Sequence, residues 1–168
     1  MKNSLLPRLK KIKMLATDVD GVLTDSGMYY SENGDELKKF NTRDGMGLVL
    51  LRKAGFKVAI VTSEDTKIVE RRAAKLKITD LFQGARDKVG ALQILMKRHS
   101  LQWEEIAYIG DDINDLEVMK RVGFAVTPSD GTDQNKKGAH YVTKKKGGEG
   151  CVREVCDLIL ALKARRTA

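Results

Sequence analysis

The sequence is poor in cysteine, proline and aromatic residues, and it has no long apolar run. Its 168 residues include two cysteines and two prolines, and only 5% are aromatic. No apolar stretch approaches the roughly 20 residues that a membrane-spanning helix needs, so we expect no membrane span. The basic first 15 residues lack the continuous apolar segment of a secretory signal. The expected location is the cytoplasm.

The two cysteines, Cys151 and Cys156, lie five positions apart. This spacing fits neither a disulfide framework nor a zinc site. We expect reduced thiols with a structural role.

Acidic residues are outnumbered, with 23 acidic against 31 basic residues and a formal net charge of +8. Such an excess can serve nucleic acid binding. However, no aromatic residue is interleaved with the lysine clusters, so no stacking platform for bases is evident. We therefore expect no nucleic acid partner. We interpret the excess of basic residues either as solvated surface or as a means of attracting a small anionic substrate.

Apolar, β-branched-rich runs alternate with amphipathic segments of helical length. The runs fall at 11–17, 57–63, 106–112 and 124–128, and the helical patterns at 44–54, 66–77, 87–99, 114–123 and 151–164. Alternation of this kind is typical of α/β proteins with a parallel sheet. The prediction is one domain over 1–168, with a doubly wound, Rossmann-like parallel sheet.

One segment departs from the alternation. Asn33-Gly34 stands between strand-like residues, which predicts a β-hairpin over about 26–41, inserted before the first long helix. A glycine-rich tail and a helix are expected over about 144–166.

Acidic and hydroxyl side chains gather where the predicted strands end. They are Asp18, Asp20, Thr62, Asp111, Asp112 and Asp115. The carboxyl ends of parallel strands are where open α/β sheets bind ligands. Carboxylates converging there repel one another unless a cation lies among them, and oxygen ligands of this kind suit Mg²⁺.

This set of residues favours phosphate chemistry. Asp18 can attack phosphorus as a nucleophile, and Asp20, two residues on, can act as the acid and base. Thr62 and Lys88 can bind the oxygens of the transferring phosphoryl group, while Mg²⁺ screens the charge of the incoming phosphate.

Four motifs in this order resemble the haloacid dehalogenase superfamily of phosphotransferases. They are "DVDGVLT", Thr62 of "VTS", Lys88, and "GDDIND". The resemblance implies metal binding by the Asp18 side chain, the Asp20 backbone carbonyl and Asp111. It also implies that Asp112 and Asp115 support these ligands.

The gaps between the motifs leave no room for a cap domain, since only 41 residues separate Asp20 from Thr62 and 25 separate Thr62 from Lys88. With "FNTRDGMG" and "KGGEGCVRE", this layout resembles the capless phosphatases of 3-deoxy-ulosonic acid phosphates. That resemblance implies a homotetramer assembled by the hairpins, with a neighbouring subunit helping to close each site. It also implies that the tail with Gly147, Gly148 and Gly150 reaches across to the neighbour.

The family that this chain resembles has two branches, which differ in substrate: a sugar acid phosphate of eight carbons in one and of nine carbons in the other. The octulosonate branch usually has Gly-Arg after the second motif, whereas this chain has Ser63-Glu64. Arg72 and Lys75 lie at i, i+3, where both can project from one helix face toward a substrate carboxylate. Glu64, Arg72 and Lys75 resemble the sugar-acid contacts of the nonulosonate branch. The prediction is 2-keto-3-deoxy-nonulosonate 9-phosphate, with 3-deoxy-D-manno-octulosonate 8-phosphate as the alternative.

Three other interpretations remain. A signalling receiver domain also combines an acidic Mg²⁺ pocket with Thr and Lys, but its phosphorylated Asp lies on a later strand. A catalytically idle assembly domain would normally have lost a carboxylate. A phosphomutase would need a substantial cap to exclude water.

Overall fold

The structure is a computed structural model, which describes residues 5–34 and 36–167, with side chains to residue 162. Its main sheet has six parallel strands in the order β5-β4-β1-β6-β7-β8. Their bounds are β1 Met14–Thr17, β4 Lys57–Val61, β5 Asp80–Phe82, β6 Ile106–Ile109, β7 Phe124–Thr127 and β8 Tyr141–Val142. From β1 the chain builds first one half of the sheet and then the other, so the strand order reverses beside β1.

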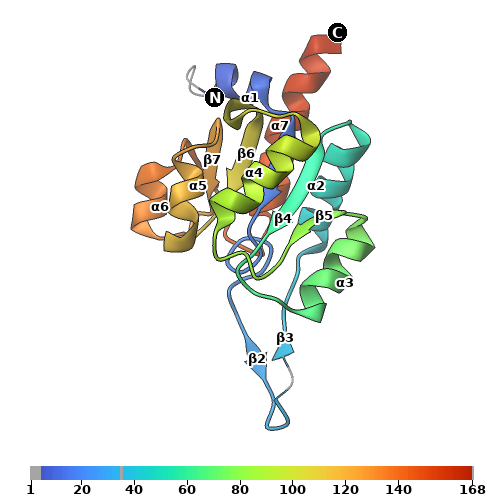
Figure 1. The fold of residues 1–168 in the computed structure, drawn as a ribbon, viewed down its shortest axis with the longest axis vertical. Coiled ribbons are helices and arrows are strands. Elements are labelled where there is room, and N and C mark those ends of the chain that lie inside the picture. The colour runs from blue at the N-terminus through green and yellow to red at the C-terminus, as the bar shows by residue number, and fades with distance from the viewer. Residues whose placement is uncertain (1–4, 35, 168) are drawn as a thin grey trace.

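Helices cover both faces of this sheet (Figure 1). The helices and 3-10 turns are α1 Leu6–Lys11, α2 Thr42–Lys53, α3 Lys67–Leu76, α4 Lys88–His99, η1 Trp103–Glu105, η2 Ile113–Asp115, α5 Leu116–Met119, α6 Asp133–Gly138 and α7 Cys151–Thr167. One core cluster joins the sheet to α1, α2, α3 and α7, and a second joins it to α4 and α5. The predicted doubly wound α/β fold is confirmed. Within the described residues, no helix combines the length and apolar character needed to cross a membrane.

The central strands are buried on both faces because successive side chains point to opposite sides. In β1, Leu15 packs in the first core cluster, whereas Met14 and Ala16 pack in the second. All four residues of β1 are buried. This explains why the strand reads as a continuous apolar run and not as an alternation. Full burial of one such aliphatic side chain contributes roughly 1.5–3 kcal/mol.

The predicted hairpin forms and projects away from the main body (Figure 1). Its strands, β2 Tyr29–Tyr30 and β3 Glu36–Leu37, are antiparallel, with Tyr29 opposite Leu37. Gly34 has a φ of +81°, a conformation that favours glycine. Between β1 and β4, residues 18–34 and 36–56 form the hairpin, α2 and their loops, and these described residues include no cap domain.

Five short elements were absent from the sequence prediction: α1, β5, η1, α6 and β8. β5 and β8 have three and two residues, too few to show a hydrophobic period. They become strands because their backbones pair with β4 and β7 at the two ends of the sheet.

Candidate active site

Three strand ends and one helix start bring the predicted catalytic residues to the same edge of the sheet. Asp18 directly follows β1, Thr62 follows β4, and Asp111 lies two residues after β6. Lys88 is the first residue of α4, which the Asp87 side chain caps by accepting a hydrogen bond from the Gly90 amide. The site therefore lies beside β1, where the strand order reverses, as expected for an open α/β sheet.

Lys88 connects two of the buried carboxylates. Its Nζ lies 2.6 Å from Asp18 Oδ2 and 2.7 Å from Asp115 Oδ1, and all three side chains are buried. Burial opposes the charge of Lys88, but attraction by Asp18 and Asp115 outweighs burial and raises the pKa of the ammonium. Lys88 is thus held as a cation beside the predicted nucleophile.

Asp115 is a supporting residue whose two oxygens are already occupied. Oδ1 accepts hydrogen bonds from Lys88 and from the Tyr108 hydroxyl at 2.6 Å, and Oδ2 accepts from the Asp111 amide at 3.0 Å and the Asp112 amide at 3.3 Å. Sequence reasoning missed Tyr108. The available signal was a tyrosine inside the apolar run before "GDDIND", because a buried tyrosine hydroxyl requires a partner.

Asp18 and Asp111 face each other in a crowded acidic environment. One carboxylate oxygen from each of Asp18, Asp111 and Asp115 lies within 4.8 Å of the others. Burial, followed by repulsion from Asp115, raises the pKa of Asp18 to about 7 and that of Asp111 to about 8. Both shifts reflect the cost of ionising carboxylates that lie close together, with Asp18 buried and Asp111 half-buried.

The donor set fits one Mg²⁺ ion. The three carboxylates and Lys88 together leave two negative charges, which one divalent cation neutralises. Mg²⁺ prefers oxygen ligands and usually takes only one or two carboxylates. In the described part of the chain no donor pairs with the Asp111 carboxylate. Each oxygen of Asp18 accepts one hydrogen bond, from the Val19 amide or from Lys88, whereas each oxygen of Asp115 accepts two. This favours Asp18 and Asp111 as ligands, with Asp115 behind them.

Gly21 allows Asp111 to approach the loop after β1. It has a φ of +75°, and a Cβ at this position would collide with the Asp111 carboxylate. The amides of Val22, Leu23 and Thr24 all donate to the Val19 carbonyl, which forms a tight loop below Asp18. The "DVDGVLT" motif therefore combines the acidic residues with the backbone that packs them.

Asp20 points toward the hairpin. Its two oxygens each lie 2.8 Å from Nζ of Lys38, which comes just after β3. Burial opposes the charge of Lys38, but the hydrogen bond and attraction of Asp20 outweigh burial and raise the pKa of the ammonium. Lys38 was also missed from the sequence, since one lysine in a hairpin carries no motif.

Thr62 and its neighbours differ in burial. Thr62 is buried at the end of β4, and its Oγ1 accepts a hydrogen bond from the Glu64 amide at 3.3 Å. The side chain of Glu64 is exposed. Asp112 is exposed as well, and its carboxylate caps η2 by accepting from the Ile113 amide at 2.7 Å. Asp112 thus stands at the outer end of the acidic group.

Arg72 and Lys75 lie on α3 in different surroundings. The Arg72 guanidinium donates to the Asn41 carbonyl at 2.9 Å and lies 5.2 Å from the centroid of the Phe40 ring. Lys75 is exposed. No hydrogen bond or ion pair within the described chain joins Glu64, Arg72 and Lys75, and their contact with a sugar acid stays a prediction.

The glycine-rich tail packs on a loop of its own chain, and its predicted reach toward a neighbouring subunit stays a prediction. The Gly148 amide donates to the Val22 carbonyl at 2.9 Å, and a Cβ on Gly147 would collide with the Gly21 carbonyl. The absence of side chains is what lets these two backbones touch. The tail therefore supports the loop that carries Asp18 and Asp20 from within the same chain.

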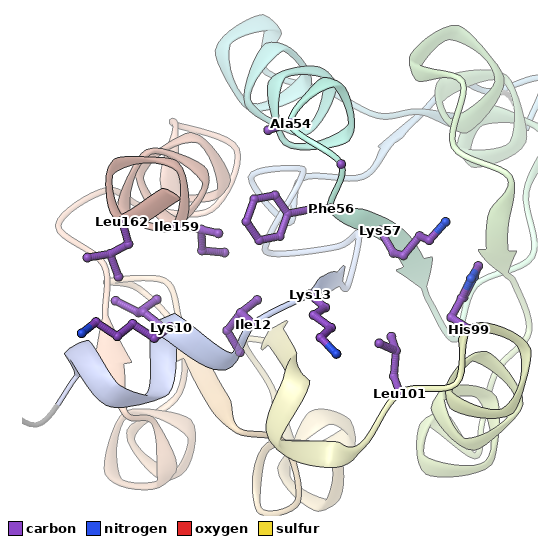
Figure 2. A pocket seen from close by; sticks show the side chains of 12 residues that line it. Lys10, Ile12, Lys13, Ala54, Phe56, Lys57, His99, Leu101, Ile159 and Leu162 are labelled. Atoms are coloured by element: carbon purple, nitrogen blue, oxygen red, sulfur yellow. The ribbon is translucent and has the colours of Figure 1, made fainter. Parts of the chain in front are cut away.

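A hollow of about 610 Å³ lies at the opposite edge of the sheet, where β1 and β4 begin. Figure 2 shows Phe56 and Ile159 on one side of it and Lys13, Lys57 and His99 on the other. None of the described side chains that line this hollow is acidic. It is therefore separate from the acidic group in both place and chemistry.

Comparison with known proteins agrees with this geometry. The family model of haloacid dehalogenase-like hydrolases matches residues 61–155, more than half of the chain. A 3-deoxy-D-manno-octulosonate 8-phosphate phosphatase of Yersinia pestis is 46% identical over 158 residues, covering 94% of this chain and 84% of that protein. The corresponding protein of Escherichia coli K12 is 42% identical, covering 96% of this chain and 86% of its relative.

Solved structures show the same fold. A 3-deoxy-D-manno-octulosonate 8-phosphate phosphatase of Moraxella catarrhalis, crystallised with magnesium, phosphate and 3-deoxy-D-manno-octulosonate (KDO), matches with a TM-score of 0.94 at 38% identity, covering 99% of this chain and 98% of that one. The cobalt-bound enzyme of Haemophilus influenzae matches with a TM-score of 0.90 at 38% identity, covering 94% and 92%. The chain belongs to the haloacid dehalogenase-like hydrolases and, among them, to the capless phosphatases of 3-deoxy-ulosonic acid phosphates.

Proposed function

We propose that this enzyme is a Mg²⁺-dependent phosphatase that hydrolyses 3-deoxy-D-manno-octulosonate 8-phosphate. The supporting observation is the 46% identity, over nearly the whole chain, to a relative named for this substrate. The Moraxella catarrhalis neighbour, crystallised with the eight-carbon acid, supports the same choice. The comparisons therefore favour the octulosonate alternative over the nonulosonate 9-phosphate that Ser63-Glu64 suggested.

The reaction follows from the positions of Asp18 and Asp20. An Asp18 oxygen attacks phosphorus, the bond from phosphorus to the sugar oxygen breaks, and Asp20 gives that oxygen a proton. Water then hydrolyses the aspartyl phosphate, and its proton passes to Asp20. Lys88 and Thr62 hold the phosphoryl oxygens. When bound, Mg²⁺ offsets the negative charge of Asp18, Asp111 and the phosphate.

The decisive experiment measures phosphate release with Mg²⁺ or EDTA. The panel holds octulosonate 8-phosphate, nonulosonate 9-phosphate, N-acetylneuraminate 9-phosphate and simple sugar phosphates. We expect Mg²⁺-dependent release with kcat/KM at least about tenfold higher for the eight-carbon acid, a difference of about 1.4 kcal/mol. Equal or higher kcat/KM for the nine-carbon acid would return the assignment to the nonulosonate reading. No release from any substrate would favour an idle assembly domain.

Glu64, Arg72 and Lys75 remain the proposed contacts to the sugar acid. Glu64 and Lys75 can be tested with little risk to folding because both side chains are exposed. Glu64→Ala and Lys75→Ala should raise KM for the sugar acid phosphate without changing KM for p-nitrophenyl phosphate. The neighbouring exposed Arg71 provides the control Arg71→Ala. An unchanged KM for the sugar acid would assign Glu64 and Lys75 to the solvated surface.

A homotetramer assembled through the hairpins is also proposed. Its support is the apolar surface of the hairpin, where Met28, Tyr29, Tyr30 and Leu37 are 44–66% exposed. Sedimentation velocity should show a tetramer that Tyr30→Lys dissociates. The control Ile94→Lys, at an exposed position of α4, should leave it intact. A monomeric wild-type protein would exclude this assembly.

The cytoplasmic location of the protein remains a prediction.

A further inference from the structure

Lys38 and Lys39 are adjacent in the sequence but have opposite surroundings. The Lys38 side chain has no exposed surface, and its ammonium lies 2.8 Å from both oxygens of Asp20. The Lys39 side chain is 58% exposed and pairs with Asp25 at 2.7 Å. Only the first of these lysines contacts the predicted acid and base.

Asp20 has few other contacts to hold it. The Thr24 hydroxyl lies 3.4 Å from Oδ1, which is a long hydrogen bond. Lys38 contacts both oxygens and therefore determines the orientation of the carboxylate plane. Lys38 is itself anchored in the hairpin, since its ammonium lies 3.4 Å from Oε1 of Glu36.

The pair leaves Asp20 able to accept a proton. An ionised carboxylate has about four lone-pair positions. Lys38 occupies two and Thr24 takes a weak share of a third. At least one position is left for a water molecule, from which Asp20 can take a proton as a general base.

We propose that Lys38 is a positioning residue for the second half of the reaction. It fixes the orientation of the Asp20 carboxylate by contacting both of its oxygens while water attacks the aspartyl phosphate. In that step a water oxygen bonds to phosphorus, the bond from Asp18 to phosphorus breaks, and the water proton moves to Asp20. Inorganic phosphate leaves, and Asp20 passes the proton to the sugar oxygen in the next cycle. This rests on the proposed phosphatase mechanism but not on the identity of the sugar acid.

The test uses the full-length enzyme with Mg²⁺ and p-nitrophenyl phosphate. The leaving phenolate of this substrate needs no proton, so kcat/KM reports the attack by Asp18, whereas kcat includes the hydrolysis of the aspartyl phosphate. In Lys38→Met, we expect kcat to fall about 100-fold, because general-base catalysis usually contributes at least this factor to the rate. The value of kcat/KM should stay nearly unchanged. Rapid-mixing experiments should show a burst of p-nitrophenolate close to one per active site, as the aspartyl phosphate accumulates.

Controls separate positioning from folding. Lys39→Met should show no burst and nearly wild-type kcat, and Lys38→Arg should recover part of kcat. If Lys38→Met fails to fold by circular dichroism, Lys38→Gln receives the same measurements. An unchanged kcat, or an equal fall in kcat and kcat/KM without a burst, would overturn the proposal. Failure of the substrate assignment would appear separately, as absent wild-type release from octulosonate 8-phosphate.

Discussion

Two regions of this protein bury carboxylates, and they do so in opposite ways. Asp44 in α2 has no exposed surface and accepts hydrogen bonds from the backbone amides of Gly150 and Arg153 at the start of α7. Asp18 and Asp111, in contrast, face each other and Asp115. Asp44 meets backbone donors, whereas Asp18 and Asp111 lie among further carboxylates, with the Lys88 ammonium and the Val19 amide donating to Asp18. A buried carboxylate surrounded by amides holds helices together, while buried and half-buried carboxylates that face one another form a site for a cation.

The largest expected difference between the two regions concerns turnover. Asp18→Asn removes the nucleophile and should lower kcat on the order of 10⁴-fold or more. The fold should survive, because the substitution also removes one of the repelling charges. Phosphate release and thermal unfolding measure the two effects. Asp25→Asn, in the same "DVDGVLTDSG" stretch, should keep nearly full activity. Undiminished Mg²⁺-dependent turnover in Asp18→Asn would exclude Asp18 as the nucleophile.

Asp44→Asn should lower the stability of the fold and leave turnover nearly unchanged, the opposite of Asp18→Asn. The Gly150 and Arg153 amides donate to different oxygens of Asp44, so the Asn side chain keeps an acceptor for one amide and turns its NH₂ group against the other. The free energy of unfolding should therefore fall by about 2 kcal/mol. The folded enzyme should retain most of its kcat. Urea unfolding measures this cost. The control Asp157→Asn removes a surface ion pair with Arg153 and should cost only about 0.3–0.5 kcal/mol. A large loss of kcat in stable Asp44→Asn would place Asp44 in the catalytic machinery.

Mg²⁺ should stabilise the protein in a pH-dependent way. The raised pKa values of Asp18 and Asp111, about 7 and about 8, mean that the metal-free fold binds protons more tightly than the unfolded chain. These carboxyls therefore stabilise the metal-free fold at low pH, and this stability is lost as pH rises from about 4 toward 8. Mg²⁺ requires the ionised forms, so its affinity should be at least about tenfold lower at pH 6 than at pH 8.5.

Thermal unfolding with and without Mg²⁺ at the two pH values measures this effect. The increase in Tm on adding Mg²⁺ should be larger at pH 8.5. Asp44→Asn should preserve the pH dependence, and Asp111→Asn should reduce it. An equal Tm increase at both pH values would show that Mg²⁺ binding does not depend on deprotonating Asp18 and Asp111.

Much of the site was predictable because its residues are local to recognisable elements. Asp18, Thr62 and Asp111 each follow an apolar run that forms a central strand, and Lys88 begins a helix with a buried face. In a parallel sheet, strand ends meet at one edge, so their order along the chain predicted their meeting in space. The same reasoning failed for partners without a local pattern. Lys38 reaches Asp20, and the tail glycines pack on the loop after β1, only because the chain folds back.

The sequence by itself determined the α/β fold, the hairpin, the four motifs and the phosphatase chemistry, because hydrophobic periodicity and carboxylate spacing are properties of short segments. The tertiary structure decided which charges meet. It paired Lys38 with Asp20 and Lys39 with Asp25, and it placed Asp44 against α7 and Asp111 against Asp18. Whether a carboxylate is a cap or part of a metal site depends on the charges and donors within a few ångströms of it. In this protein those groups come from distant parts of the chain.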